Sequence, residues 1–103
     1  MQLSRTEATR AALANSSGLY GQSDVNTSAS AISTNAKIGH HGVAVRSLSS
    51  NTAVVWVGFD DSVSATTGVE LHPGEGVTLN IDQADKVFAY TATATQRVSY
   101  IVT

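Results

Sequence analysis

The chain has no cysteine, and this absence excludes several kinds of site. Without thiols there is no disulfide framework, no zinc site built on cysteine and no cysteine nucleophile. The absence does not identify a compartment, because a cysteine-free protein tolerates both oxidising and reducing conditions. No glycine-rich loop of the phosphate-binding kind precedes a helix, and no cofactor is expected.

Charged residues are also scarce. They make up 14% of the 103 residues, compared with about 25% in an average soluble domain, and the net charge is −2. The six basic residues form no stripe that could neutralise phosphates, so nucleic acid is not an expected partner. A surface with little charge and many Ser, Thr, Ala and Val residues is suited to packing against other proteins.

Long apolar runs are missing as well. No run approaches the roughly 18 residues that a membrane span needs, so no membrane association is expected. Residues 1–15 lack the apolar core of a signal peptide, and a secretory route is not expected.

The composition changes near Ile38, and this change suggests a domain boundary. Before it, large apolar residues are rare and Ser, Thr, Ala, Asn and Gly dominate. Such a stretch buries little apolar surface, so residues 1–37 are expected to form an N-terminal arm that is flexible or becomes ordered on assembly. Residues 4–7 fit a helix capping box, which leaves a short helix or a disordered arm as alternatives, and residues 25–34 can form an edge strand. Residues 38–103 are expected to form one β-sandwich domain.

Short β-type runs follow one another from Gly42 onward. They cover residues 43–48, 53–59, 69–71, 77–81, 87–91 and 98–102, with turn residues between them. The second run is bulky on both faces, which indicates a central strand covered on both sides. Pro73 and Gly74 occupy the two central positions of an expected type II turn in a hairpin. The pattern predicts an all-β fold, a small antiparallel sandwich of about six or seven strands that is jelly-roll-like or barrel-like.

The alternation of these runs also predicts the core. Trp56 and Tyr90 are expected at a rim or interface. The expected core residues are Val43, Val45, Val55, Val57, Leu71, Val77, Leu79, Ile81, Val87, Ala89 and Ile101.

Several polar residues are candidates for chemistry, but their spacing favours ordinary roles. His40, His41 and His72 show no metal-binding spacing, and we expect solvated loop histidines rather than a metal site within one chain or on an oligomer axis. Asp60 and Asp61 lie in a polar loop without the pattern of a calcium site.

Catalysis is not expected either. Glu70 and Glu75 flank a tight turn and are expected to be exposed, and no nucleophile motif is present. We therefore expect no enzyme and assign no catalytic, cofactor-binding or metal-binding residue. Trp56 with Tyr90 and Tyr100 can alternatively form an aromatic platform for a sugar, although a tryptophan within a strong strand is more often part of a core.

Beyond these patterns, a series of motifs spans about 60 residues. It runs through residues 42–48, 50–52, 54–58, 67–71, 73–75, 77–79 and 87–90, and includes a Gly-x-x-Leu-x-Pro-Gly-Glu segment and a Val-Phe-Ala strand. This series resembles a recurring β-sandwich module of tailed-phage virion proteins. The position of Trp56 is more often Tyr in that module, and the N-terminal arm is not part of it.

The resemblance implies a structural protein of the phage particle that is made in the host cytoplasm. A capsid decoration or cement protein, which binds the major capsid protein and stabilises the head, is the first expectation. The alternatives are a head fibre, a tail or head–tail adaptor piece, and, from another class, a carbohydrate-binding module. A homo-oligomer is expected, with a trimer favoured, because a closed ring repeats one small contact surface.

Overall fold

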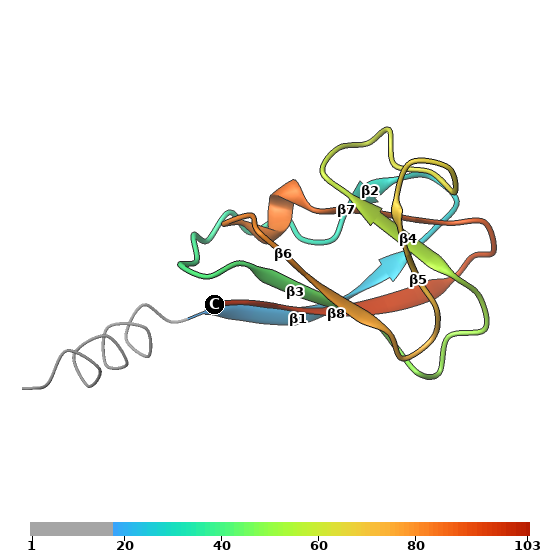
Figure 1. Cartoon of the computed structure of the whole chain (residues 1–103), viewed down its shortest axis with the longest axis horizontal. Coiled ribbons are helices and arrows are strands. Elements are labelled where there is room, and N and C mark those ends of the chain that lie inside the picture. Colours follow the sequence, from blue (N-terminus) through green and yellow to red (C-terminus); the bar gives the residue numbers. More distant parts are fainter. Residues whose placement is uncertain (1–17) are drawn as a thin grey trace, which may run out of the picture.

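Two antiparallel four-stranded sheets, packed face to face, form the part of the chain that the computed structural model describes, residues 18–103 (Figure 1). The first sheet, here called the β1 sheet, has the order β1-β8-β3-β6 and the second, the β4 sheet, has the order β2-β7-β4-β5. The β1 sheet contains β1 (Leu19–Val25), β8 (Gln96–Val102), β3 (Val43–Ser47) and β6 (Gly76–Leu79). The β4 sheet contains β2 (Ser30–Ala31), β7 (Phe88–Thr91), β4 (Val55–Gly58) and β5 (Val69–Leu71), and a single 3-10 turn, η1 (Ala84–Lys86), precedes β7.

The chain crosses from one sheet to the other at every connection except that between β4 and β5. This strand order is that of an eight-stranded jelly roll, in which strands from the two halves of the chain alternate within each sheet. The expected all-β antiparallel sandwich is confirmed, and the structure has the jelly-roll order rather than a closed barrel.

The ordered fold begins well before the expected boundary at Ile38. β1 and β2 both lie within the stretch assigned to the arm, and β1 pairs with β8 from Leu19 opposite Val102 to Val25 opposite Gln96. The composition was misleading because a strand at the edge of a sheet needs apolar residues on one face only. The helix or disordered arm expected around residues 4–14 lies outside the described residues.

Valine dominates the interior between the sheets, and most of the expected core is confirmed. Val77 and Ile81 are half-buried against it, whereas Ile101 is 47% exposed and was wrongly placed in the core. In β8 the even-numbered side chains point inward, so Val98 and Val102 take the place assigned to Ile101. The buried apolar residues are Val25, Ile32, Val43, Val45, Val55, Val57, Val63, Leu71, Leu79, Ala84, Val87, Ala89, Val98 and Val102.

β4 is an interior strand, but only one of its faces is covered by the other sheet. Val55 and Val57 are fully buried, while Trp56 is half-buried on the outer face. The expectation of cover on both sides was wrong, although the loop of residues 59–68 covers one end of this face. Val63 of that loop is 6% exposed and lies against Gly58, where an added β-carbon would come within 3.0 Å of the Val63 Cγ2 atom.

The turn at residues 72–75 has the expected type. Gly74 has a φ of +87°, and the Glu75 N–H donates to the His72 carbonyl at 2.9 Å, as in a type II turn. However, the turn does not close a hairpin, because β5 pairs with β4 and β6 pairs with β3. It carries the chain from the β4 sheet to the β1 sheet.

Candidate functional site

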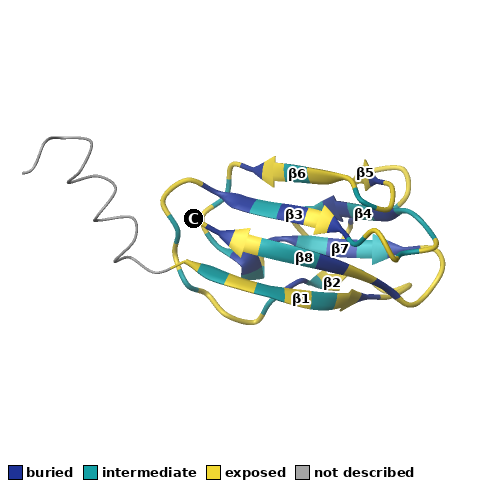
Figure 2. Ribbon diagram, turned by 90° about the horizontal axis from the view of Figure 1, so that it is seen from below, coloured by how far each residue is buried: buried dark blue, intermediate teal, exposed yellow. Residues whose placement is uncertain are grey.

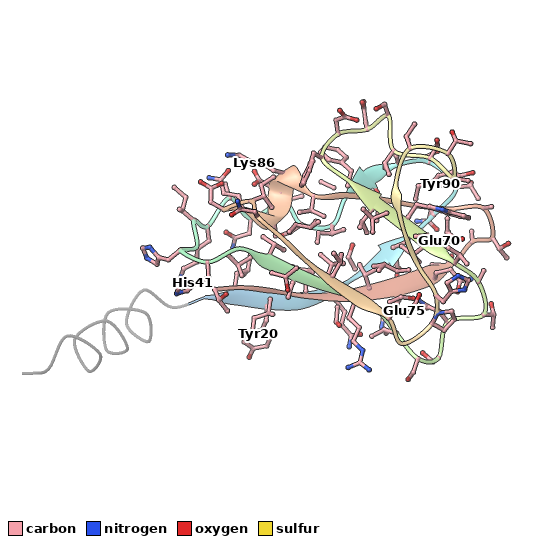
Figure 3. The ribbon with its side chains drawn as sticks, in the orientation of Figure 1. Tyr20, His41, Glu70, Glu75, Lys86 and Tyr90 are labelled. Carbon is pink, nitrogen blue, oxygen red and sulfur yellow. The ribbon has the colours of Figure 1, made fainter. Side chains whose placement is uncertain are left out.

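The outer face of the β1 sheet exposes an apolar row. Tyr20 and Ile101 lie directly opposite each other on β1 and β8, and Ile101 lies opposite Ala44 on β3. Tyr20 is 80% exposed, the largest value among the large hydrophobic residues of the described chain, and its side chain projects away from the sheet (Figure 3). Residues of β3, β6 and β8 on this face line a shallow depression of about 320 Å³.

Next to this row, the charged side chains of the face already form hydrogen bonds within the chain. The Arg97 guanidinium donates to the Asp24 carboxylate at 2.9 Å and to the Gln22 amide oxygen at 3.3 Å. Arg46 donates to the Gly74 carbonyl at 3.1 Å. The face therefore presents apolar side chains beside the Arg97–Asp24 ion pair and the hydrogen-bonded Arg46 guanidinium.

The outer face of the β4 sheet carries a second row, which is aromatic and acidic. The Trp56 and Tyr90 rings lie on neighbouring strands with their centroids 5.8 Å apart and their planes at 40°. Glu70 lies on the other side of Trp56, and its carboxylate is 3.8 Å from the His72 Nε2 atom. Tyr100 is absent from this row because it packs against the core from the β1 sheet, so the alternative of a three-ring platform is reduced to two rings.

The remaining candidate residues lie apart from one another. His40 and His41 are exposed in the loop before β3, and their backbone N–H groups both donate to the Thr103 carbonyl, at 2.7 and 2.8 Å. His72 lies in the turn between β5 and β6, and Glu75 of that turn accepts the His72 backbone N–H at 2.7 Å. Among residues 18–103, no three His, Asp or Glu side chains come together in a group that could hold a metal ion.

Asp60 forms a local turn with Ser62. Its carboxylate accepts hydrogen bonds from the Ser62 hydroxyl and, at 2.9 Å, from the Ser62 backbone N–H. These bonds, led by that from the hydroxyl, lower the pKa of Asp60 from its ordinary value. Both Asp60 and Asp61 are exposed, which fits the solvated loop expected from the sequence.

One polar cluster was missed by the sequence reasoning. Gln96 is only 3% exposed, and its side-chain oxygen accepts the backbone N–H groups of Thr52 and Ala53 at 2.8 and 3.1 Å. Its amide nitrogen donates to the Thr93 carbonyl at 2.8 Å. Nearby, Asn51 donates to the Ser47 hydroxyl at 2.8 Å. These bonds fasten the β3–β4 connection to the start of β8, so the cluster is structural.

Comparison with protein families, with curated proteins and with solved structures found no match to this chain. None of the helical segments in the described residues is long and apolar enough to cross a membrane.

Proposed function

We propose that the chain is a structural protein of a tailed-phage particle, a capsid decoration protein that binds the major capsid protein and stabilises the head. The observation that carries this proposal is the exposed row of Tyr20 and Ile101 on the β1 sheet. Large apolar side chains gathered on one exposed face mark a surface that another protein covers. The sequence resemblance gives the class of partner, and jelly rolls are a common architecture of viral shells. Since one fold serves many functions, the fold by itself decides nothing.

The chemistry of this face suits a protein partner. Burying it would keep the Arg97–Asp24 ion pair intact, and the Arg46 guanidinium would keep its hydrogen bond to the Gly74 carbonyl. Small residues such as Ala44 and Ser99 allow a flat surface to approach closely. Each contact is modest, but repeated copies on a lattice act together, and binding to the assembled shell rather than to free subunits stabilises the shell.

Co-sedimentation with purified heads of the phage that encodes the chain tests the proposal. Ile101→Asp should lower the affinity for heads at least about tenfold, since it places a charge in the contact. Phe59→Asp is the matched control, because Phe59 is 60% exposed but belongs to the loop after β4. Equal binding of wild type and Ile101→Asp, or no binding to heads at any salt concentration, would overturn the proposal. Binding to purified tails instead would support the alternative of a tail or adaptor component.

A second candidate function, carbohydrate binding, rests on the Trp56–Tyr90 pair. Two aromatic rings beside the Glu70 carboxylate combine a surface for the apolar face of a sugar with a hydrogen-bond acceptor for its hydroxyls. A glycan array with wild type and Tyr90→Ala tests it. Binding that is lost in the variant would favour this function, and the absence of binding by wild type would remove it.

A further inference from the structure

Among residues 18–103, β1 is the longest edge strand, and no other described strand covers its outer edge. It has seven residues, whereas the other three edge strands, β2, β5 and β6, have two, three and four. Proteins protect exposed edges with short strands, lysine, proline or bulges, because a free edge can pair with another strand. β1 contains neither lysine nor proline, and its register with β8 is unbroken along its full length. It lies at the edge of the sheet beside β8 (Figure 2).

The direction of the backbone groups along β1 follows from the hydrogen bonds of β8. The Thr103 N–H donates to the Gly42 carbonyl, and the Arg97 carbonyl accepts from the Leu48 N–H. In β8 and at Thr103, therefore, the odd-numbered residues direct their backbone N–H and carbonyl groups toward β3. The backbone groups of the even-numbered residues of β8 therefore point toward β1, where they bond to the odd-numbered residues of that strand. The backbone groups of Tyr20, Gln22 and Asp24 consequently point away from the sheet. Within residues 18–103, only the Ser23 hydroxyl approaches one of these groups, the Asp24 carbonyl at 3.4 Å.

We propose that this edge pairs with β1 of a second copy of the chain, in an antiparallel two-fold dimer centred on Gln22. In that register Gln22 meets Gln22, and Tyr20 meets Asp24 of the second copy in both directions. Each of these three pairs exchanges two N–H···O bonds. Shifting the strands by two residues in either direction leaves only two such pairs, so the backbone itself selects the centred register.

The side chains of β1 are self-complementary in the same register. On the outer face, the Tyr20 ring lies beside the Asp24–Arg97 pair of the second copy, which offers a cation to the ring and an acceptor to its hydroxyl. The Gln22 oxygen already accepts from Arg97, which leaves its amide N–H groups free to donate across the two-fold axis. On the inner face, half-buried Leu19 meets buried Val25, which joins the two cores.

The dimer is independent of the capsid binding proposed above and is compatible with it. Both outer faces would lie on the same side of one continuous eight-stranded sheet, which doubles the Tyr20–Ile101 row presented to a partner. A two-fold pair also differs from the trimer favoured by the sequence, so the measured oligomeric state distinguishes the two.

Sedimentation equilibrium of the full chain at micromolar concentrations tests the proposal. Wild type should dimerise, and Gln22→Pro should raise the dissociation constant by more than about tenfold, because the proline removes an outward N–H. Thr78→Pro is the matched control, since β6 is the opposite edge of the same sheet and the Thr78 N–H also points outward. A monomer, a trimer, or a dimer weakened equally by both prolines would overturn the proposal.

A cross-link keeps the test informative if a proline variant fails to fold. The chain has no cysteine, so Gln22→Cys introduces a single thiol. Facing α-carbons in a hydrogen-bonded antiparallel pair are about 5.5 Å apart, within the range of about 4.4–6.8 Å that a disulfide spans. Under mild oxidation Gln22→Cys should form a covalent dimer, and Thr78→Cys should remain largely monomeric. Equal cross-linking of both variants, or none in Gln22→Cys, would contradict the centred register.

Discussion

Val63 lies against Gly58 so closely that a β-carbon at Gly58 would come 3.0 Å from the Val63 Cγ2 atom and 3.1 Å from its Cβ atom. Gly58 ends β4 on the outer face of the β4 sheet, and Val63 belongs to the loop that folds back over this face. Gly68 also lies against Val63, and a β-carbon added at Gly68 would come 2.7 Å from the Val63 Cγ2 atom. The two glycines thus make room for Val63, which is the buried apolar residue of a largely polar loop.

Substituting Gly58 with Ala should lower the free energy of unfolding by about 1–3 kcal/mol, because the methyl group overpacks this contact. Urea denaturation measures the change. Combining Gly58→Ala with Val63→Ala should cost less than the sum of the two single variants, because alanine at position 63 removes the Cγ2 contact and keeps only the Cβ contact. Additive effects would show that the contact with Val63 does not set the cost.

Replacing Gln96 with Ala should destabilise the fold by about 2–4 kcal/mol, because several buried backbone groups would lose their partner together. These groups are the N–H groups of Thr52 and Ala53 and the carbonyl of Thr93. Gln83→Ala is the control, since the Gln83 side chain makes one exposed hydrogen bond, to the Ala36 carbonyl at 3.1 Å. Similar thermal unfolding of both variants would contradict a structural role for the Gln96 cluster.

The alternation of apolar residues predicted much of this fold. It located the six strands from β3 to β8 and most of the valine core, because a strand with one buried face needs an apolar residue at every second position. The Pro73–Gly74 pair predicted its turn type through local backbone geometry alone. It could not predict that the turn crosses between sheets, since that depends on which strands pair over long distances.

The misplaced residues share one cause. Ile101 and Val102 are adjacent and both apolar, and only the register with β3 and β1 decides which of them faces inward. Likewise, Gln96 resembles a turn residue in the sequence, and only the fold brings residues 51–53 to its side chain. The two candidate surfaces also depend on long-range pairing, because Tyr20 meets Ile101 across 81 positions of the chain.

Shortening Val57 to Ala should cost about 1–3 kcal/mol through lost burial and the cavity left behind, because Val57 is fully buried. Val69 provides a matched control, since it lies directly opposite Val57 on β5 but is 46% exposed. Val69→Ala should therefore change the stability by less than about 0.5 kcal/mol. Denaturation midpoints measure both. An unchanged midpoint for Val57→Ala would move β4 out of the core and contradict the packing described above.

The hydrogen bonds from Ser62 to Asp60 should make a small pH-dependent contribution to stability. They favour the charged carboxylate, so the pKa of Asp60 is lower in the folded chain than in the unfolded chain. The unfolded chain then binds more protons as the pH falls. The contribution to stability is therefore present above the unfolded pKa and lost as the pH falls through the folded pKa.

Ser62→Ala removes the hydroxyl, which is the larger cause, and should raise the pKa of Asp60 toward its ordinary value. Carboxyl NMR titration measures that pKa directly. The stability difference between wild type and Ser62→Ala should be present at neutral pH and shrink in acid, and a difference that grows in acid would contradict this sign.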